Sequence, residues 1–170
     1  MHSDQMAKKK AEHLPELSET LIEPDPNDPN ATILELDELW SFVLKKVNTS
    51  WIWIALCRKT RQVVSYAIGD RSKETCQKLW DTIPLAYRTG KCFTDFYSAY
   101  KSIIPQDQHY PVGKQTGETA HVERWNCTLR QRIGRFVRKT LSFSKSNRMH
   151  EICLHLFLHR YNTEKALAFM

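Results

Sequence analysis

The sequence predicts an α/β domain with a mixed five-stranded sheet flanked by helices. Three apolar segments follow one another between residues 31 and 70, joined by short polar links. Helical and strand patterns then alternate as far as residue 114. Two helical patterns complete the chain. Sequential hairpin strands followed by alternating helices and strands form a sheet that is covered by helices.

The first three strands are expected in residues 31–47, 50–60 and 61–70. "ATILELDELWSFVLKKV" carries large apolar residues along its length, and "SWIWIALCRKT" is nearly all apolar on one side. "RQVVSYAIGD" has the β-branched pair of a third strand. The polar links at 45–50 and 58–62 are typical of hairpin turns.

Helices and short strands are expected to alternate after residue 70. Ser72 is a plausible N-cap for a helix over 72–87. A buried strand, Lys91 to Thr94, ends at Asp95. A small helix over 98–104 and a fifth strand within 106–114 follow.

Two helices are predicted at the end of the chain. In the first, which begins after Thr119, apolar residues step by three and four as far as Val137. The second covers 146–162 and is expected to turn inward Met149, Ile152, Cys153, Leu156 and Phe157. The whole order is that of the ribonuclease-H-like fold, which we assign to residues 31–165. Residues 1–30 are expected to be a flexible, acidic and proline-rich tail with at most a helical turn.

The basic residues of this chain are concentrated in one segment. The chain has 170 residues and a formal charge of +6. Residues 121–146, "HVERWNCTLRQRIGRFVRKTLSFSKS", contain seven Lys or Arg residues and one acid, so the remainder sums to zero. A local basic patch suits a polyanion, either nucleic acid or, less often, an anionic membrane surface.

Other classes of protein are disfavoured by composition. No apolar stretch is long enough to span a membrane, and "MHSDQMAKKKAEHLPELSE" lacks the apolar core of a signal peptide. A cytoplasmic protein is therefore expected. The five cysteines are odd in number and widely spaced, which argues against a disulfide framework or a cysteine-type zinc site.

Three acids are candidates for a metal site. Asp37 lies within an apolar strand, Asp95 ends the fourth strand, and Glu123 has no cation three or four residues away on its helix. The first and fourth strands are neighbours in the expected fold, and a helix crossing that edge can supply a third acid. Converging carboxylates repel one another and bind Mg²⁺, of which two ions can promote phosphoryl transfer.

Plainer interpretations of these polar residues remain open. An aspartate at a strand end is often only a turn former, and Asp70, Asp81 and Glu38 are weaker alternatives to the three acids. Glu38 points to the opposite strand face from Asp37. His155 and His159 lie four residues apart and are expected on a solvated face of the last helix.

Three motifs resemble those of the transposases of the insertion-sequence-one family. "ELDELW" resembles the first acidic motif of that family, and "TDFYSAY" resembles the second. The segment 121–146 resembles its C-terminal signature, which is long and specific. The resemblance covers Ile33 to about Tyr161.

The resemblance implies a catalytic mechanism. Asp37, Asp95 and Glu123 would be a DDE triad that binds two Mg²⁺ ions, for which Mn²⁺ can substitute. The reaction would be cleavage at the element ends followed by transfer of the freed 3′-hydroxyl to target DNA. His121, beside the triad acid, would assist. Asn126 and Arg130 match positions that contact DNA in the family. The basic segment itself predicts phosphate contacts at Arg135, Arg138, Lys139 and Lys145, of which the first three cluster at helical spacing.

The resemblance also implies partners and a cellular setting. The partner is double-stranded DNA, as element ends and as target, in a prokaryotic cytoplasm with the protein on the nucleoid. A homo-oligomer is expected. Members usually carry an N-terminal zinc-binding and helix-turn-helix region, and no paired cysteines precede Ala31. The chain therefore resembles a second-frame product that frameshifting joins to an upstream product, or a truncated copy.

Two alternative functions remain open at this stage. One is a different ribonuclease-H-like nuclease, which would commonly use a fourth carboxylate. The other is a transposase remnant that binds DNA without sequence preference and no longer catalyses.

Overall fold

The computed structural model describes residues 2–170 and contains one five-stranded mixed sheet. The strand order is β3-β2-β1-β4-β5, in which the first three strands are antiparallel and β4 and β5 are parallel to β1. This is the ribonuclease-H-like arrangement that the sequence predicted. The strands are β1 (Leu34–Val43), β2 (Lys45–Cys57), β3 (Val63–Gly69), β4 (Cys92–Thr94) and β5 (His109–Pro111).

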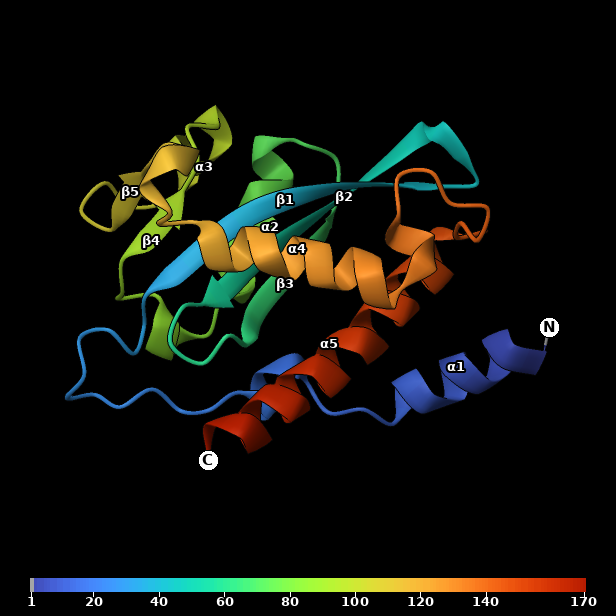
Figure 1. Ribbon diagram of the computed structural model, residues 1–170, viewed down its shortest axis with the longest axis horizontal. Coiled ribbons are helices and arrows are strands. Elements are labelled where there is room, and N and C mark those ends of the chain that lie inside the picture. The colour runs from blue at the N-terminus through green and yellow to red at the C-terminus, as the bar shows by residue number, and fades with distance from the viewer. Residues whose placement is uncertain (1) are drawn as a thin grey trace.

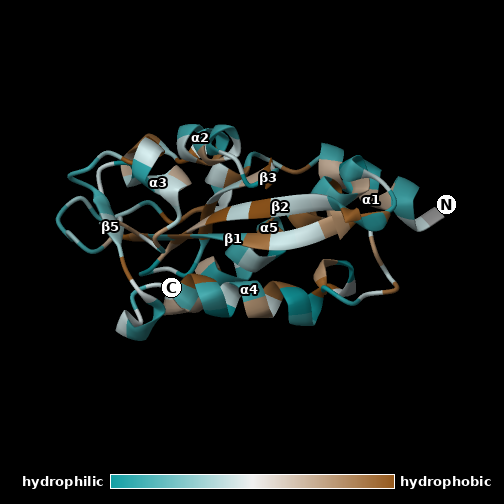
Figure 2. Cartoon of the chain, turned by 90° about the horizontal axis from the view of Figure 1, so that it is seen from above, coloured by the Kyte–Doolittle hydropathy of each residue, from teal (hydrophilic) through white to brown (hydrophobic). Residues whose placement is uncertain are grey.

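Helices cover both faces of the sheet (Figures 1 and 2). On one face, α2 (Lys73–Thr82) and α3 (Ser98–Ile103) enclose a core that contains Leu34, Leu36 and Trp53. On the other face, α4 (Ala120–Arg132) and α5 (Asn147–Phe169) enclose a core that contains Leu39, Ile52 and Ile54. Alternate residues of the central strands therefore supply two separate apolar cores.

The hairpin between β1 and β2 differs from the prediction. The link expected at 45–50 is the beginning of β2, and the chain turns at Leu44, whose φ is 63°. Residues 45–49 are exposed, and form an arm that extends past β3 (Figure 1). Their polar composition, which suggested a turn, reflects a strand that has solvent on both faces. The second link, from Arg58 to Gln62, is where it was predicted.

The helix that carries Glu123 is shorter than predicted. It ends at Arg132, because Ile133 is extended and Gly134 begins the 3-10 turn η4 (Gly134–Phe136). The apolar spacing continues to Phe136, which is buried, although the helix has already ended. Arg135 consequently lies in η4, and Arg138 and Lys139 lie in the loop that follows it, so the three do not share a face of α4. We call residues 133–146 the basic loop.

Both ends of the chain contain more helix than expected. The predicted tail includes α1 (His2–Glu12), which packs against α5, and the 3-10 helix η1 (Leu17–Thr20), whose Leu17 is buried. Helix α5 continues to Phe169, past the predicted end. Its buried face includes Met149 and Phe157 as predicted, with Leu154 and Leu158 in place of Ile152, Cys153 and Leu156.

The outer edge of β3 is closed at its first residue by a side chain from α5. The Val63 N–H donates to Asn162 Oδ1 at 2.8 Å, and Asn162 Nδ2 donates to the Val63 carbonyl at 2.9 Å. Asn162 is fully buried and also donates to Thr20 Oγ1 at 2.9 Å. One amide thus takes the place of a neighbouring strand and connects α5, β3 and η1.

Replacement of Asn162 by alanine should destabilise the fold. Asn162→Ala leaves the N–H and C=O of Val63 without partners in a buried site, and each unmet group costs about 1–3 kcal/mol. We expect the free energy of unfolding, measured by urea titration, to decrease by about 2–4 kcal/mol. Asn48→Ala, on the exposed arm, is the matched control and should change it by less than about 0.5 kcal/mol. Equal effects would contradict the role of this amide.

Candidate active site

A cavity of about 370 Å³ lies where the edge of β1 becomes free. Strand β4 pairs with β1 only at Leu34 and Glu35, so the β1 edge beyond them has no strand beside it. Asp37 lies on that free edge, and Asp95 directly follows β4. Helix α4 crosses the same place and brings Glu123. The three predicted acids therefore all line this one cavity.

Asp37 is the most perturbed acid of the site. Burial, with the nearby carboxylates of Glu38, Asp95 and Glu123, raises the pKa of Asp37 to about 7. Asn126 Nδ2 donates to Asp37 Oδ2 at 2.7 Å, which connects α4 to β1. Mutual repulsion of this kind is relieved when a cation binds.

The other two acids are held by short local contacts. Asp95 Oδ1 accepts from the Tyr97 N–H at 2.9 Å, which makes the turn after β4. Glu123 Oε1 accepts from the hydroxyl of Thr119 at 3.1 Å. None of the ion pairs formed within residues 2–170 includes Glu123. Its presence in a basic segment is therefore not explained by a salt bridge in the described part of the chain.

A buried acid that the sequence analysis did not select fixes the position of α4. Glu35 is fully buried, and its Oε1 accepts from the His121 N–H at 3.0 Å, within the first turn of α4. Its Oε2 accepts from Arg58 Nε at 3.2 Å and lies 2.7 Å from His121 Nδ1. His121, which was expected to assist the catalytic acids, thus contacts Glu35 instead. Glu35 lies two residues before Asp37 in an apolar strand, which was the available signal.

Glu38 is a fourth carboxylate of the cavity. It lies on the opposite face of β1 from Asp37, as expected, but the cavity extends around the free edge and reaches both faces. Arg71 donates to Glu38 Oε1 through Nε at 2.9 Å and Nη2 at 2.7 Å, and the Tyr100 hydroxyl donates to Oε2 at 2.7 Å. Burial raises the pKa of Glu38, opposed by the hydrogen bonds from Tyr100 and Arg71.

Three of the predicted DNA-contacting residues line the cavity. They are Asn126, Arg130 and Arg138. The Nε of Arg130 is buried without a hydrogen-bond partner in residues 2–170, and burial together with Arg138 lowers the pKa of Arg130. Outside the cavity, Arg135 is partly buried and its Nη1 donates to Ser144 Oγ at 3.4 Å. Lys139 and Lys145 are exposed.

The basic loop is attached to β1 by a buried histidine. His150 is fully buried, with Nδ1 2.7 Å from Ser144 Oγ and Nε2 2.8 Å from Ser41 Oγ. The Leu44 N–H donates to the Ser144 carbonyl at 2.8 Å, next to a single bridge between Val43 and Ser144. Burial, assisted by the charge of Arg135, lowers the pKa of His150 to about 4. A neutral ring therefore holds the loop beside the arm.

The sequence matches a known protein family over the same region. Residues 31–163 match the model of the IS1 transposase family. The chain belongs to the IS1 transposase family. It is similar to the insertion element iso-IS1n protein InsB of Shigella dysenteriae, with 38% identity over 133 residues, 77% of this chain and 97% of that protein. The IS1 protein InsB of Shigella flexneri is 34% identical over 117 residues, 69% of this chain and 86% of that protein.

Family membership confirms the resemblance noted from the motifs. The function is that of a transposase, a DNA-modifying enzyme, and the motifs that carry the resemblance lie on β1, after β4 and along α4 with the basic loop. In the part of the chain that the structure covers, no helix is both long and apolar enough to cross a membrane.

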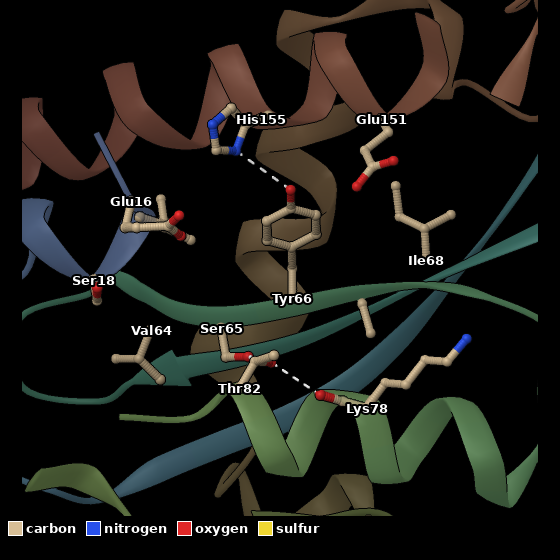
Figure 3. Close-up of a pocket in the computed structure, with 12 residues that line it drawn as sticks. Glu16, Ser18, Val64, Ser65, Tyr66, Ile68, Lys78, Thr82, Glu151 and His155 are labelled. Carbon is tan, nitrogen blue, oxygen red and sulfur yellow. Dashed lines mark hydrogen bonds between the residues drawn. The ribbon is translucent and has the colours of Figure 1, made fainter. Parts of the chain in front are cut away.

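The transposase has a second cavity, of about 470 Å³, at the outer edge of β3 (Figure 3). None of the predicted site residues lines it. In Figure 3 the Tyr66 hydroxyl points to His155, whose Nδ1 lies 3.3 Å away. The expectation that His155 and His159 lie on a solvated face was wrong, since His159 is buried and His155 is half-buried against β3. The apolar residues next to these histidines in the sequence were the indication that this part of α5 packs against the rest of the protein.

The buried state of His150 predicts a pH dependence of stability. Its pKa is about 4 in the folded chain and near 6.5 when unfolded, so between these values the unfolded state binds more protons. Stability that comes from His150 is therefore lost as the pH decreases from 6.5 to 4. His150→Gln should lower the free energy of unfolding at pH 7 by about 1–3 kcal/mol. It should also show a smaller decrease than the parent over that pH interval.

The measurement is denaturant unfolding at several pH values. His13→Gln, at an exposed histidine, is the control and should reproduce the pH profile of the parent. A His150→Gln profile parallel to that of the parent would show that His150 already takes up a proton in the folded state.

Proposed function

We propose that this transposase cleaves DNA at the ends of its element and transfers the freed strands to target DNA, with Asp37, Asp95 and Glu123 as the catalytic acids. The observation that supports this is their arrangement. A strand, a strand end and a helix each contribute one acid to a single cavity. Burial, together with the charges of Glu38, Asp95 and Glu123, raises the pKa of Asp37 to about 7. An acidic cluster of this kind is stabilised by divalent cations.

The donor set suits Mg²⁺, and Mn²⁺ as a substitute. The three acids offer only oxygen atoms as ligands. Asn126 donates a hydrogen bond to Asp37 through Nδ2, and its Oδ1 is buried and has no hydrogen-bond partner in residues 2–170. As the side chains stand, no three His, Cys, Asp or Glu residues of this region are close enough to share an ion. The side chains would have to move closer together to share an ion. The ions, when bound, would make the attacking oxygen more nucleophilic and stabilise the leaving one.

The residues around the acids would position the DNA backbone. The unpaired Nε of Arg130 is a donor without an acceptor, which a phosphate oxygen can supply. Arg138 lines the same cavity from the basic loop. Asn126 would keep Asp37 oriented through its 2.7 Å hydrogen bond. The exposed Lys139 and Lys145 would neutralise phosphates farther along the duplex. Joining two element ends would require a homo-oligomer, with or without an upstream-frame product.

A different ribonuclease-H-like nuclease is the second candidate. Glu38 favours it, since a fourth carboxylate lines the cavity. Glu38, however, already accepts hydrogen bonds from Arg71 and Tyr100. Those donors would have to be displaced before Glu38 could bind a cation, and so we prefer the three-acid site.

Neutralising the triad should separate catalysis from binding. Asp37→Asn or Asp95→Asn should abolish Mg²⁺-dependent nicking of element-end DNA, because each removes a charged metal ligand. DNA affinity should stay equal or increase, since a negative charge is lost near phosphate. Glu38→Gln is the matched control and should retain nicking. A triad variant that nicks at the parental rate would exclude that acid from catalysis, and loss of nicking in Glu38→Gln alone would favour the four-carboxylate nuclease.

The basic loop should control the salt dependence of binding. Replacing Arg138 and Lys139 together with alanine removes two phosphate contacts, each worth about 0.9 unit in the slope of log affinity against log salt. We therefore expect the slope for duplex DNA to become shallower by up to about two units, equally for element ends and unrelated sequences.

The control for this change is the pair Lys73 and Lys101, exposed cations on α2 and α3. Their replacement should leave the slope unchanged. A loss confined to element ends would mean that Arg138 and Lys139 read bases. An unchanged slope in the Arg138 and Lys139 variant would mean that the basic loop does not bind the duplex.

A further inference from the structure

Two tryptophans line the candidate active site on the side away from α4. Trp40 of β1 and Trp51 of β2 are direct cross-strand partners in the antiparallel pair. Both line the cavity that holds Asp37 and Asp95, and both are partly buried. The nearby Trp53 is different, because it is fully buried and its Nε1 donates to the Asp70 carbonyl at 3.0 Å. Trp51 packs in part against the core on this side of the sheet, and each of the two rings keeps a part that is exposed to solvent.

An arginine extends this aromatic surface. The Arg71 guanidinium lies 4.9 Å from the ring centroid of Trp51 and 4.3 Å from that of Tyr97. Glu38 holds it through the two hydrogen bonds described above, so the guanidinium plane is fixed in place. Its side chain is still 43% exposed. Trp40, Trp51 and Arg71 together form what we call the stacking surface.

The chemistry of the stacking surface matches unpaired nucleobases. Aromatic rings and arginine planes are the surfaces on which single-stranded bases stack, with little dependence on sequence. The bases of intact duplex are already stacked on one another and do not offer these faces. Lys114 and Arg138 line the same cavity and can pair with the phosphates of a single strand. Asp95 lines it too, so a base stacked here would lie close to the proposed reaction.

We propose that the stacking surface binds unpaired nucleotides of single-stranded DNA beside the catalytic acids. This inference rests on the proposed function, and it names the form of DNA that this part of the site takes. Frayed or displaced nucleotides at a cleaved end would stack on Trp40 and Trp51, while the duplex lies along the basic loop. The two forms of DNA would thus be held by different parts of one site.

The test measures affinity in the absence of metal ions, using the full chain with Asp37→Asn as the background. Fluorescence anisotropy is recorded with a labelled oligothymidylate and with a labelled duplex of unrelated sequence. Adding Trp40→Ala should weaken oligothymidylate binding by at least about fivefold, which corresponds to loss of one stacked base. Duplex affinity should change by less than about twofold. Arg71→Lys keeps the charge but loses the plane, and should show the same selective loss.

Two further variants guard against an indirect effect. Trp80→Ala removes a partly buried tryptophan of α2 that does not line the cavity, and should leave both affinities unchanged. Trp40→Phe keeps an aromatic ring and should restore most of the oligothymidylate affinity. Thermal unfolding of each variant identifies any general loss of structure, in which case Trp40→Phe and Arg71→Lys decide the result.

Unchanged oligothymidylate affinity in both Trp40→Ala and Arg71→Lys would overturn the inference. An equal loss for duplex and single strand would also overturn it, because the surface would then be part of a general DNA face. The proposed function fails separately, if Asp37→Asn protein with no other change still nicks DNA. Binding without metal does not depend on that outcome.

Discussion

The buried carboxylate of Glu35 is the contact on which the arrangement of the site depends. It accepts from the backbone of the first turn of α4 and from Arg58, and it lies two residues before Asp37. A carboxylate at a helix N-terminus is favoured both by the free N–H groups and by the helix dipole. Here the carboxylate belongs to another element, so the same contact joins the strand that carries Asp37 to the helix that carries Glu123. The hydrogen bond from Asn126 to Asp37 joins the same two elements farther along α4.

The second constraint is the short pairing between β1 and β4. Because β4 contributes only three residues, the far part of β1 has one edge without a strand. Side chains from both faces can reach around such an edge, which is why Asp37 and Glu38 line the same cavity although they point in opposite directions. One face meets α4, with Asn126 and Arg130. The other meets Arg71 and the tryptophans. The cavity is therefore acidic at its centre and has cations on both sides.

The carboxylates of the site fall into two groups, those that form a salt bridge and those that do not. Glu35 and Glu38 are paired with Arg58 and Arg71, which satisfies them inside the protein. The acids Asp37, Asp95 and Glu123 have no cationic partner among the salt bridges of residues 2–170. Burial, with the neighbouring carboxylates, raises the pKa of Asp37. This contrast separates structural carboxylates from those free to act in chemistry.

Local pattern by itself determined the order of the strands and of helices α2 to α5, and with it the fold class. It also indicated Asp37, Asp95 and Glu123, because an acid in an apolar strand, at a strand end or without a cation nearby on its helix is visible in neighbouring residues. It also placed Ser72 as the cap of α2, where its hydroxyl accepts from the Thr75 N–H. Only the tertiary structure decided which acids have hydrogen-bond and salt-bridge partners. Glu35 and Glu38 look like Asp37 in the strand, and what distinguishes them is Arg58, Arg71 and Tyr100, which are distant in the chain. The burial of His150 and His159 was likewise decided by contacts with other elements, since the role of a polar residue depends on the groups that folding places around it.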